Sequence, residues 1–196
     1  QNKILIAMDE VATGFYRTGK KFYFENLNFI PDIVCMSKGI NSGYVPFGAV
    51  GFKDFIIEEY KNNNVFLAHG STQAGNLIGC ASVIGTLEEY KNLNISSNVY
   101  EQGDFIKQSL IEGMKSHSNV KSIRGTGLLI SIDLKENVSV RKMCQERIAS
   151  IQNMLAINGV LVYRSFAGLT LMPMLNIRKE ESNLLVNKLI SFFKGR

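Results

Sequence analysis

Two side chains that could do chemistry together each follow a short apolar run. Asp9 comes directly after the run at residues 3–8, and Lys38 follows the run at residues 32–36 after one serine. Near-continuous apolar runs of this length are typical of strands that are buried on both faces of a parallel sheet. Because open α/β sheets bind ligands beyond the carboxyl ends of their strands, we expect both side chains at one site.

A lysine at the end of a buried strand is suited to carbonyl chemistry. Burial disfavours an ammonium, so a desolvated lysine becomes a nucleophilic amine that can form an imine. The alternative for Lys38 is a solvated loop lysine, because most lysines are exposed. The alternative for Asp9 is a helix N-cap or a surface turn. The local pattern alone leaves both alternatives open.

Longer segments around these residues resemble the class III aminotransferases, which depend on pyridoxal 5'-phosphate (PLP). They read DEVATGFYRTGK at residues 9–20, PDIVCMSKGI at 31–40, GYVPFGAV at 43–50 and HGSTQAGN at 69–76. The segments occur in the family's order, and the resemblance is strongest up to about Glu89. It implies an α/β fold, in which the C-terminal part of a fold type I large domain with a mixed, mostly parallel sheet precedes a small α+β domain.

The resemblance also implies roles for particular residues. Lys38 matches the lysine that forms the internal aldimine with PLP and later moves the substrate proton, and Asp9 matches the carboxylate that pairs with the pyridine nitrogen. Val11 matches an aliphatic residue packed on the cofactor ring, although an ordinary core position is the alternative. Thr72 matches a hydroxyl that reaches the cofactor phosphate of the neighbouring subunit, and the Ser-Thr pair could also cap a helix.

Other positions depart from the family pattern. Arg164 lies near an arginine that binds substrate carboxylate in the family, but Tyr163 is closer to the expected register, and a surface arginine is the alternative. Ala12 stands where many members carry glutamine. The family's phosphate-binding loop and ring-stacking aromatic precede the counterpart of Asp9 and are not among these 196 residues. The chain opens with Gln1 in place of Met and runs straight into an apolar stretch, which leads us to expect a fragment or a processed chain.

The hydrophobic periodicity predicts two domains. The pattern changes after residue 91, so we expect residues 1–91 to belong to the PLP-binding large domain and residues 92–196 to form the small α+β domain. Helices are expected at residues 53–61, 73–90, 97–117, 139–158 and 179–193. Strands are expected at residues 3–8, 32–36, 46–52, 127–134, 160–164 and 169–172.

Composition excludes several other classes of protein. The chain is 45% hydrophobic and 20% charged, with a net charge of +5 from scattered basic residues, so we expect small anionic ligands and no nucleic acid. No apolar run is long enough to cross a bilayer. The cysteines are odd in number and widely spaced, so we expect reduced, buried thiols of a cytoplasmic protein. Two histidines give no triad and no metal site.

These observations together predict a transaminase. It would move an amino group from an amino donor to an oxo acid or aldehyde by a ping-pong route, as a homodimer with shared active sites. An aminomutase or a decarboxylase of the same family would keep Lys38 and Asp9. A noncatalytic fragment or interaction module that has lost half of the site is the alternative from another class.

Overall fold

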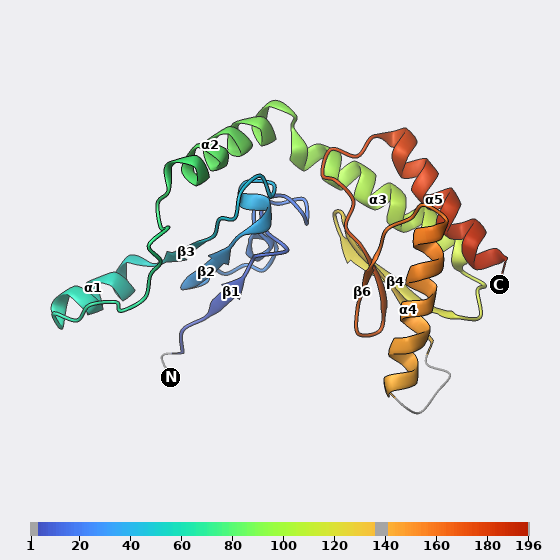
Figure 1. Ribbon diagram of the computed structural model, residues 1–196, viewed down its shortest axis with the longest axis horizontal. Coiled ribbons are helices and arrows are strands. Elements are labelled where there is room, and N and C mark those ends of the chain that lie inside the picture. The colour runs from blue at the N-terminus through green and yellow to red at the C-terminus, as the bar shows by residue number, and fades with distance from the viewer. Residues whose placement is uncertain (1–3, 136–140, 196) are drawn as a thin grey trace. The chain divides into compact units, whose positions relative to one another are not determined.

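The computed structural model describes residues 4–135 and 141–195, without the side chains of residues 141–144. The chain divides into two compact units, Gln1–Asn94 and Ile95–Arg196, which are coloured blue to green and green to red in Figure 1. The predicted domain boundary, after residue 91, lies three residues before this division. That the two parts are separate domains remains a prediction.

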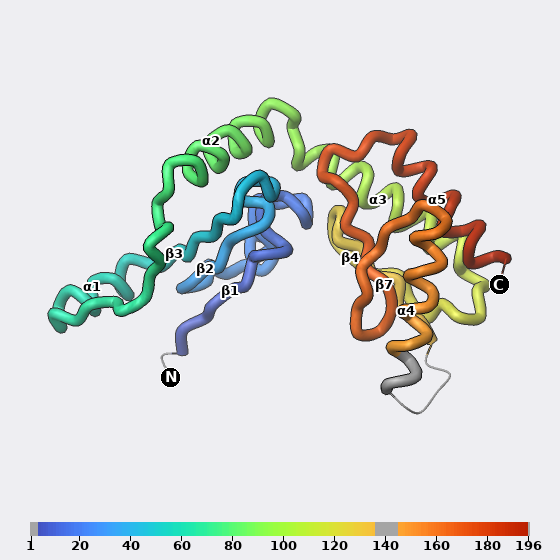
Figure 2. Tube along the Cα trace, in the orientation of Figure 1, coloured from blue at the N-terminus to red at the C-terminus, as the bar shows by residue number. Residues whose placement is uncertain are grey.

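A small mixed sheet forms the centre of the first unit. Its strands are β1 (Ala7–Asp9), β2 (Ile33–Met36) and β3 (Ala49–Phe52), in that spatial order. Strand β1 runs parallel to β2, whereas β3 is antiparallel to it. Figure 2 shows the three strands side by side. The predicted mixed sheet is therefore present.

The first strand does not have the expected burial. No residue of β1, β2 or β3 is fully buried, and Ile4, Leu5 and Ile6 are 76%, 52% and 44% exposed. The prediction of strands buried on both faces is wrong for the described residues. The reason is that no helix of the described residues packs closely on β1, β2 or β3, so no layer of helices covers this sheet.

Two helices follow the sheet in the described part of this unit, α1 (Asp54–Asn62) and α2 (Leu77–Asn92). Helix α2 begins four residues later than predicted. Its N-cap is Asn76, whose side-chain oxygen accepts a hydrogen bond from the Gly79 amide at 2.7 Å. The Ser-Thr pair at 71–72 is therefore not the cap, because the Asn76 side chain satisfies the first turn instead.

The second unit contains a four-stranded antiparallel sheet. Its strands are β4 (Val120–Thr126), β5 (Leu129–Leu134), β6 (Tyr163–Arg164) and β7 (Gly168–Leu171), in the spatial order β4-β5-β7-β6. The predicted strand at 160–164 shrinks to two residues. Strand β4 was not predicted as a strand.

Three helices accompany this sheet: α3 (Ile95–Met114), α4 (Arg141–Ile157) and α5 (Lys179–Lys194). Helix α3 packs against α5, β4 and β5, while α4 contacts β6 and β7. The unit has a hydrophobic core in which the following side chains are completely inaccessible: Val99, Ile106, Leu110, Leu128, Ile130, Ile132, Leu155, Leu169 and Leu189. Helices and an antiparallel sheet make this unit α+β, as predicted.

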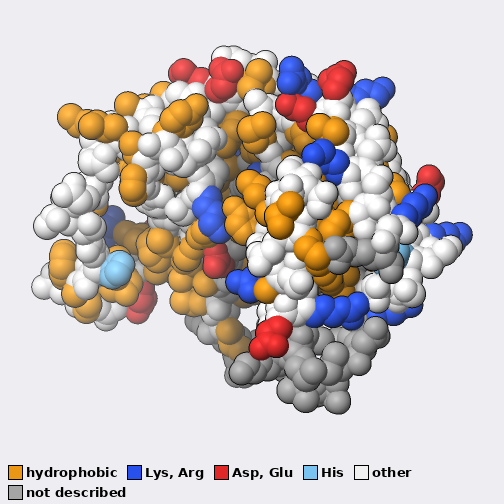
Figure 3. Space-filling view, turned by 45° about the vertical axis from the view of Figure 1, so that its right-hand side comes forward, with side chains coloured by type: hydrophobic (Ala, Val, Ile, Leu, Met, Phe, Trp, Pro, Cys, Tyr) orange, Lys and Arg blue, Asp and Glu red, His pale blue; other side chains and the backbone are white. Residues whose placement is uncertain are grey.

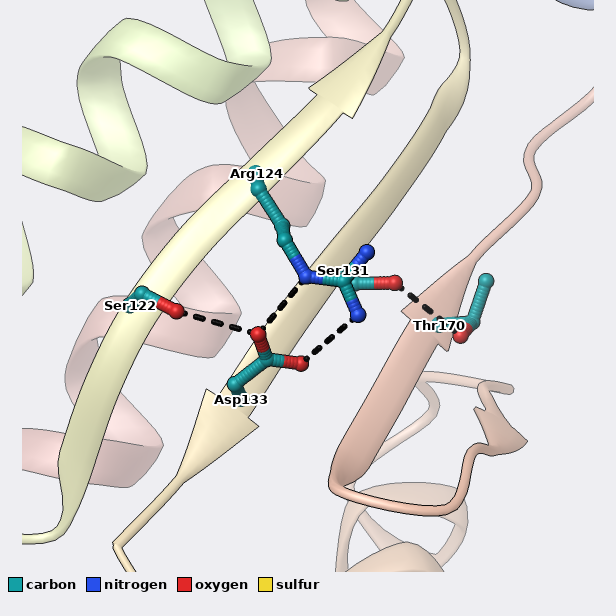
Figure 4. A network of polar contacts seen from close by, with 5 residues as sticks. All are labelled: Ser122, Arg124, Ser131, Asp133 and Thr170. Atoms are coloured by element: carbon teal, nitrogen blue, oxygen red, sulfur yellow. Dashed lines mark hydrogen bonds and ion pairs between the residues drawn. The ribbon is translucent and has the colours of Figure 1, made fainter.

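One face of this sheet is polar. In strand β5, Ser131 and Asp133 alternate with the buried Ile130 and Ile132. Figure 4 shows Asp133 and its partners on the face of the sheet turned toward the viewer, with helices behind it. The Asp133 carboxylate accepts hydrogen bonds from Arg124 Nε at 2.8 Å and from a serine hydroxyl of β4 at 3.0 Å. Burial raises the pKa of Asp133, but these hydrogen bonds outweigh it and hold the pKa below its usual value.

Two thiols are described. Cys35 and Cys80 are free and half-buried, whereas fully buried thiols were predicted. Cys35 lies in strand β2 and Cys80 in helix α2. The side chain of Cys144 lies outside the described part. Among the described residues, no helix combines the length and apolar character needed to span a membrane.

Candidate active site

The carboxyl ends of two adjacent parallel strands form the candidate site. Asp9 is the last residue of β1 and pairs in register with Cys35 of β2. Lys38 comes two residues after the end of β2. The structure therefore places a carboxylate and an amine at the same end of neighbouring strands, where α/β sheets bind their ligands.

Both side chains are accessible. Asp9 is exposed, and its Oδ1 accepts a hydrogen bond from the amide of Val11 at 3.0 Å, which fixes the turn that follows β1. Val11 itself is half-buried. Lys38 is exposed, so the prediction of a buried lysine is wrong for the described residues. The chain turns away from the sheet at η2 (Lys38–Ile40), a single 3-10 turn, and this carries the lysine out of the strand.

The η2 turn is tightly seated. Lys38 has a φ angle of +42°, a left-handed conformation that is unfavourable for a residue with a side chain. A Cβ added to Gly39 would lie 2.8 Å from the Cβ of Phe15, which is closer than such atoms approach. Glycine is therefore required there for the η2 turn to pack against the segment that follows Asp9.

A buried glutamate organises that segment. Glu10 is completely inaccessible, and its two carboxyl oxygens accept hydrogen bonds from the Thr13 hydroxyl and from the Phe24 amide, the latter at 2.9 Å. The side chain thus joins both ends of the connection after β1. The sequence predicts Glu10 only as the polar end of a strand. The only signal in the sequence for this role was an acidic side chain directly after Asp9. The hydrogen-bond partner of Glu10, 14 residues away, could not be inferred.

The remaining predicted residues lie on other elements. Thr72 is exposed, in a turn before α2. Arg164 is exposed and pairs through its backbone with Leu169 in the sheet of the second unit, and Tyr163 beside it is also exposed. The structure brings Asp9, Val11 and Lys38 to one end of the first sheet. The roles of Thr72 and Arg164 remain predictions.

Solved structures of aminotransferases have the same fold. A Bacillus anthracis aminotransferase matches with a TM-score of 0.87 and 33% identity, over 98% of this chain and 45% of that one. A transaminase from the marine bacterium Virgibacillus matches with a TM-score of 0.89 and 29% identity, over 98% and 45%. The fold is therefore that of the fold type I PLP-transferases, in its C-terminal part, as predicted.

Sequence comparison gives the family. The profile of "Aminotransferase class-III" matches residues 1–193, and the chain belongs to this family. It is 32% identical to acetylornithine aminotransferase of Bacillus subtilis, over 96% of the chain and 45% of that protein. It is 28% identical to adenosylmethionine-8-amino-7-oxononanoate aminotransferase of Staphylococcus aureus, over 93% and 41%. The chain thus spans less than half the length of these relatives.

The residues at the sheet edge fit the cofactor of this family. PLP presents an aldehyde, which reacts with a primary amine, and a pyridine nitrogen, which a carboxylate can keep protonated. Lys38 supplies the primary amine and Asp9 supplies the carboxylate. Both side chains are exposed at the carboxyl ends of the strands, where a ligand can reach them. The chemistry of the available side chains is therefore suited to PLP.

Proposed function

We propose that the protein works as a PLP-dependent aminotransferase that moves an amino group between an amino donor and an oxo acid or aldehyde. The observation that carries this proposal is the placement of Asp9 and Lys38 at the same end of two adjacent parallel strands. Membership of the class III family supports it. The order of events is ping-pong: the product of the donor leaves before the acceptor binds.

Each residue has a distinct task in this proposal. Lys38 would hold the cofactor through Nζ and would take and return the proton at the reacting carbon of the substrate. Asp9 keeps a proton on the pyridine nitrogen by its negative charge. PLP, when bound, supplies an electron sink for the pair left by that proton. An exposed Lys38 in the free chain suits this task, because the amine must be reachable by an aldehyde.

Further residues complete the proposed site. Val11, half-buried beside Asp9, would pack on the cofactor ring. Thr72 would donate its hydroxyl to the phosphate held by a neighbouring subunit, which makes the working unit a homodimer with shared sites. Arg164 would bind a substrate carboxylate through its forked guanidinium. A cytoplasmic location is proposed from the free thiols Cys35 and Cys80.

Borohydride trapping tests the assignment of Lys38. The full-length protein is incubated with PLP, reduced with borohydride and cleaved, and the lysine that carries the label is identified by mass spectrometry. We expect the label on Lys38, and we expect Lys38→Ala to lose both the label and turnover. Lys20→Ala is the control, because Lys20 is an exposed lysine of the same unit. A label on any other lysine would contradict the proposal.

A further inference from the structure

Tyr90, near the end of α2, contacts the loops that follow both strands of the candidate site. Its phenol donates a hydrogen bond to the carbonyl of Gly39, directly after Lys38, at 2.8 Å. Its ring packs edge to face against Tyr16, in the connection after Asp9, with the centroids 5.6 Å apart. Tyr90 is buried. One side chain therefore ties together the segments that carry the carboxylate and the amine.

The direction of the hydrogen bonds follows from the single proton of the phenol. Tyr90 Oη also lies 2.8 Å from Ser42 Oγ. Because the phenol donates to the Gly39 carbonyl, the Ser42 hydroxyl must donate to the phenol. Burial raises the pKa of Tyr90, and the Ser42 hydrogen bond and the charge of Arg17 only partly offset this. The phenol thus stays protonated and remains a donor to the η2 turn.

The η2 turn needs such support because Lys38 is left-handed. A non-glycine residue at a φ angle of +42° persists only where its surroundings fix it, and such residues gather at functional sites. A second contact of α2 helps here. The Asn41 side chain donates to Ser82 Oγ at 3.1 Å and to the Val45 carbonyl at 2.8 Å. Ser82 lies about two helical turns before Tyr90, on the same side of the helix.

We propose that Tyr90 is a positioning residue for Lys38. Its hydrogen bond to the Gly39 carbonyl fixes the left-handed turn from which the lysine amine reaches the PLP aldehyde. The inference rests on the proposed role of Lys38. Tyr90 need not touch the cofactor or the substrate, and it acts only through the backbone next to Lys38. Ser42 orients the phenol in the same chain of hydrogen bonds.

The test compares Tyr90→Phe with Tyr100→Phe in the full-length protein. Phenylalanine keeps the ring but removes the donor, and Tyr100 is an exposed tyrosine of α3 whose hydroxyl serves as the control. The main readout is the rate at which the cofactor-free protein captures PLP on Lys38, followed by borohydride quenching at timed intervals. Steady-state kinetics give kcat and KM, and urea unfolding reports global stability.

We expect Tyr90→Phe to slow PLP capture and to lower kcat by about fivefold each, the factor that corresponds to one net hydrogen bond. KM for the amino donor should stay within about twofold, because substrate binding is not involved. Tyr100→Phe should change none of these values. A general loss of structure would instead lower the labelled fraction and the apparent kcat by the same factor, without slowing the capture rate of the folded molecules.

The outcomes separate the two proposals. If the wild-type protein captures PLP on a lysine other than Lys38, the proposed function fails. If it captures PLP on Lys38 but Tyr90→Phe captures it at the wild-type rate, only the positioning role is overturned. Should Tyr90→Phe not fold, Ser42→Ala decides instead, since it weakens the same chain of hydrogen bonds: slower capture supports the role, and an unchanged rate refutes it.

Discussion

At the scale of single residues, the role proposed for Asp9 can be separated from cofactor binding. Asp9→Asn keeps the shape of the side chain and leaves Lys38 free to hold the cofactor. The amide cannot keep the pyridine nitrogen protonated, so we expect the rate to fall about 10²–10³-fold while PLP stays bound. Single-turnover kinetics on the PLP-loaded variant measure this loss. Near-normal kinetics would show that Asp9 serves the fold and not the reaction.

Asp133, in the other unit, should make stability depend on pH. Its pKa is lowered in the folded protein, so its stabilising effect is present above the unfolded pKa of about 3.9 and is lost as the pH falls through the folded value. Asp133→Asn should therefore cost about 1–2 kcal/mol at neutral pH, and the difference from wild type should narrow below about pH 4. Urea unfolding over this range gives the measurement.

Asp104→Asn is the matched control for this residue. Asp104 pairs with Lys107 at 3.6 Å on the surface of α3, and its side chain is 67% exposed. Exposed pairs of this kind contribute little, so the change should stay within about 0.5 kcal/mol. Equal effects of the two substitutions would mean that the Arg124–Asp133 pair on the polar face of the sheet contributes no more than an ordinary surface pair.

The sequence could predict some of the site's residues and contacts but not others. The placement of Asp9 and Lys38 was predictable because each follows its own strand within a few residues. The contacts of Glu10 and Tyr90 were not, since their partners lie 14 and 51 residues away. The exposure of Lys38 was also missed. Burial depends on which elements pack against a strand, and an apolar run does not specify those elements.

At the scale of elements, periodicity predicted the helices better than the strands. Helices α1, α3 and α5 lie within three residues of their expected ends, because their apolar positions repeat on one face. Strand β4 was missed for a physical reason. Its pairing with β5 shifts register between Val120 and Ser122, and this irregularity breaks the alternation by which a strand is recognised.

Helix α3 should not tolerate a side chain at Gly103. A Cβ there would lie 2.3 Å from the carbonyl oxygen of Gly127, in the turn between β4 and β5, and backbone cannot move aside as a flexible side chain can. We expect Gly103→Ala to destabilise the protein by about 1–3 kcal/mol in urea unfolding. The close approach of helix and turn would then be a requirement of the second unit.

Gly85→Ala is the control for this substitution. Gly85 is also inside a helix, α2, but a Cβ there meets nothing within 4 Å. Alanine loses less conformational entropy than glycine on folding, so the change should be neutral or should stabilise by about 0.5–1 kcal/mol. If Gly103→Ala behaves like Gly85→Ala, the packing of α3 on the turn is looser than described.

At the scale of the whole molecule, the first unit exposes several large apolar side chains. The most exposed large apolar side chains include Ile4, Phe66, Leu77 and Ile78, each more than 70% accessible, and Figure 3 shows hydrophobic side chains at the surface of the chain. The relatives are also about twice as long as this chain. The proposed assembly into a homodimer therefore needs a test of its own, separate from the exposed surface.

Subunit exchange tests whether that assembly is a homodimer with shared sites. If Thr72 serves the neighbour's cofactor, mixing Lys38→Ala and Thr72→Ala proteins creates heterodimers in which one site carries both lesions and the other carries neither. Each heterodimer should then recover about half of the activity of a native dimer, since one of its two sites is intact. Lys38→Ala mixed with Asp9→Asn is the control. These residues lie at adjacent strand ends of one chain, so every site keeps a lesion and activity stays low. If the first mixture recovers no activity although exchange is verified by mass spectrometry, Thr72 acts within its own subunit and the shared-site arrangement is wrong.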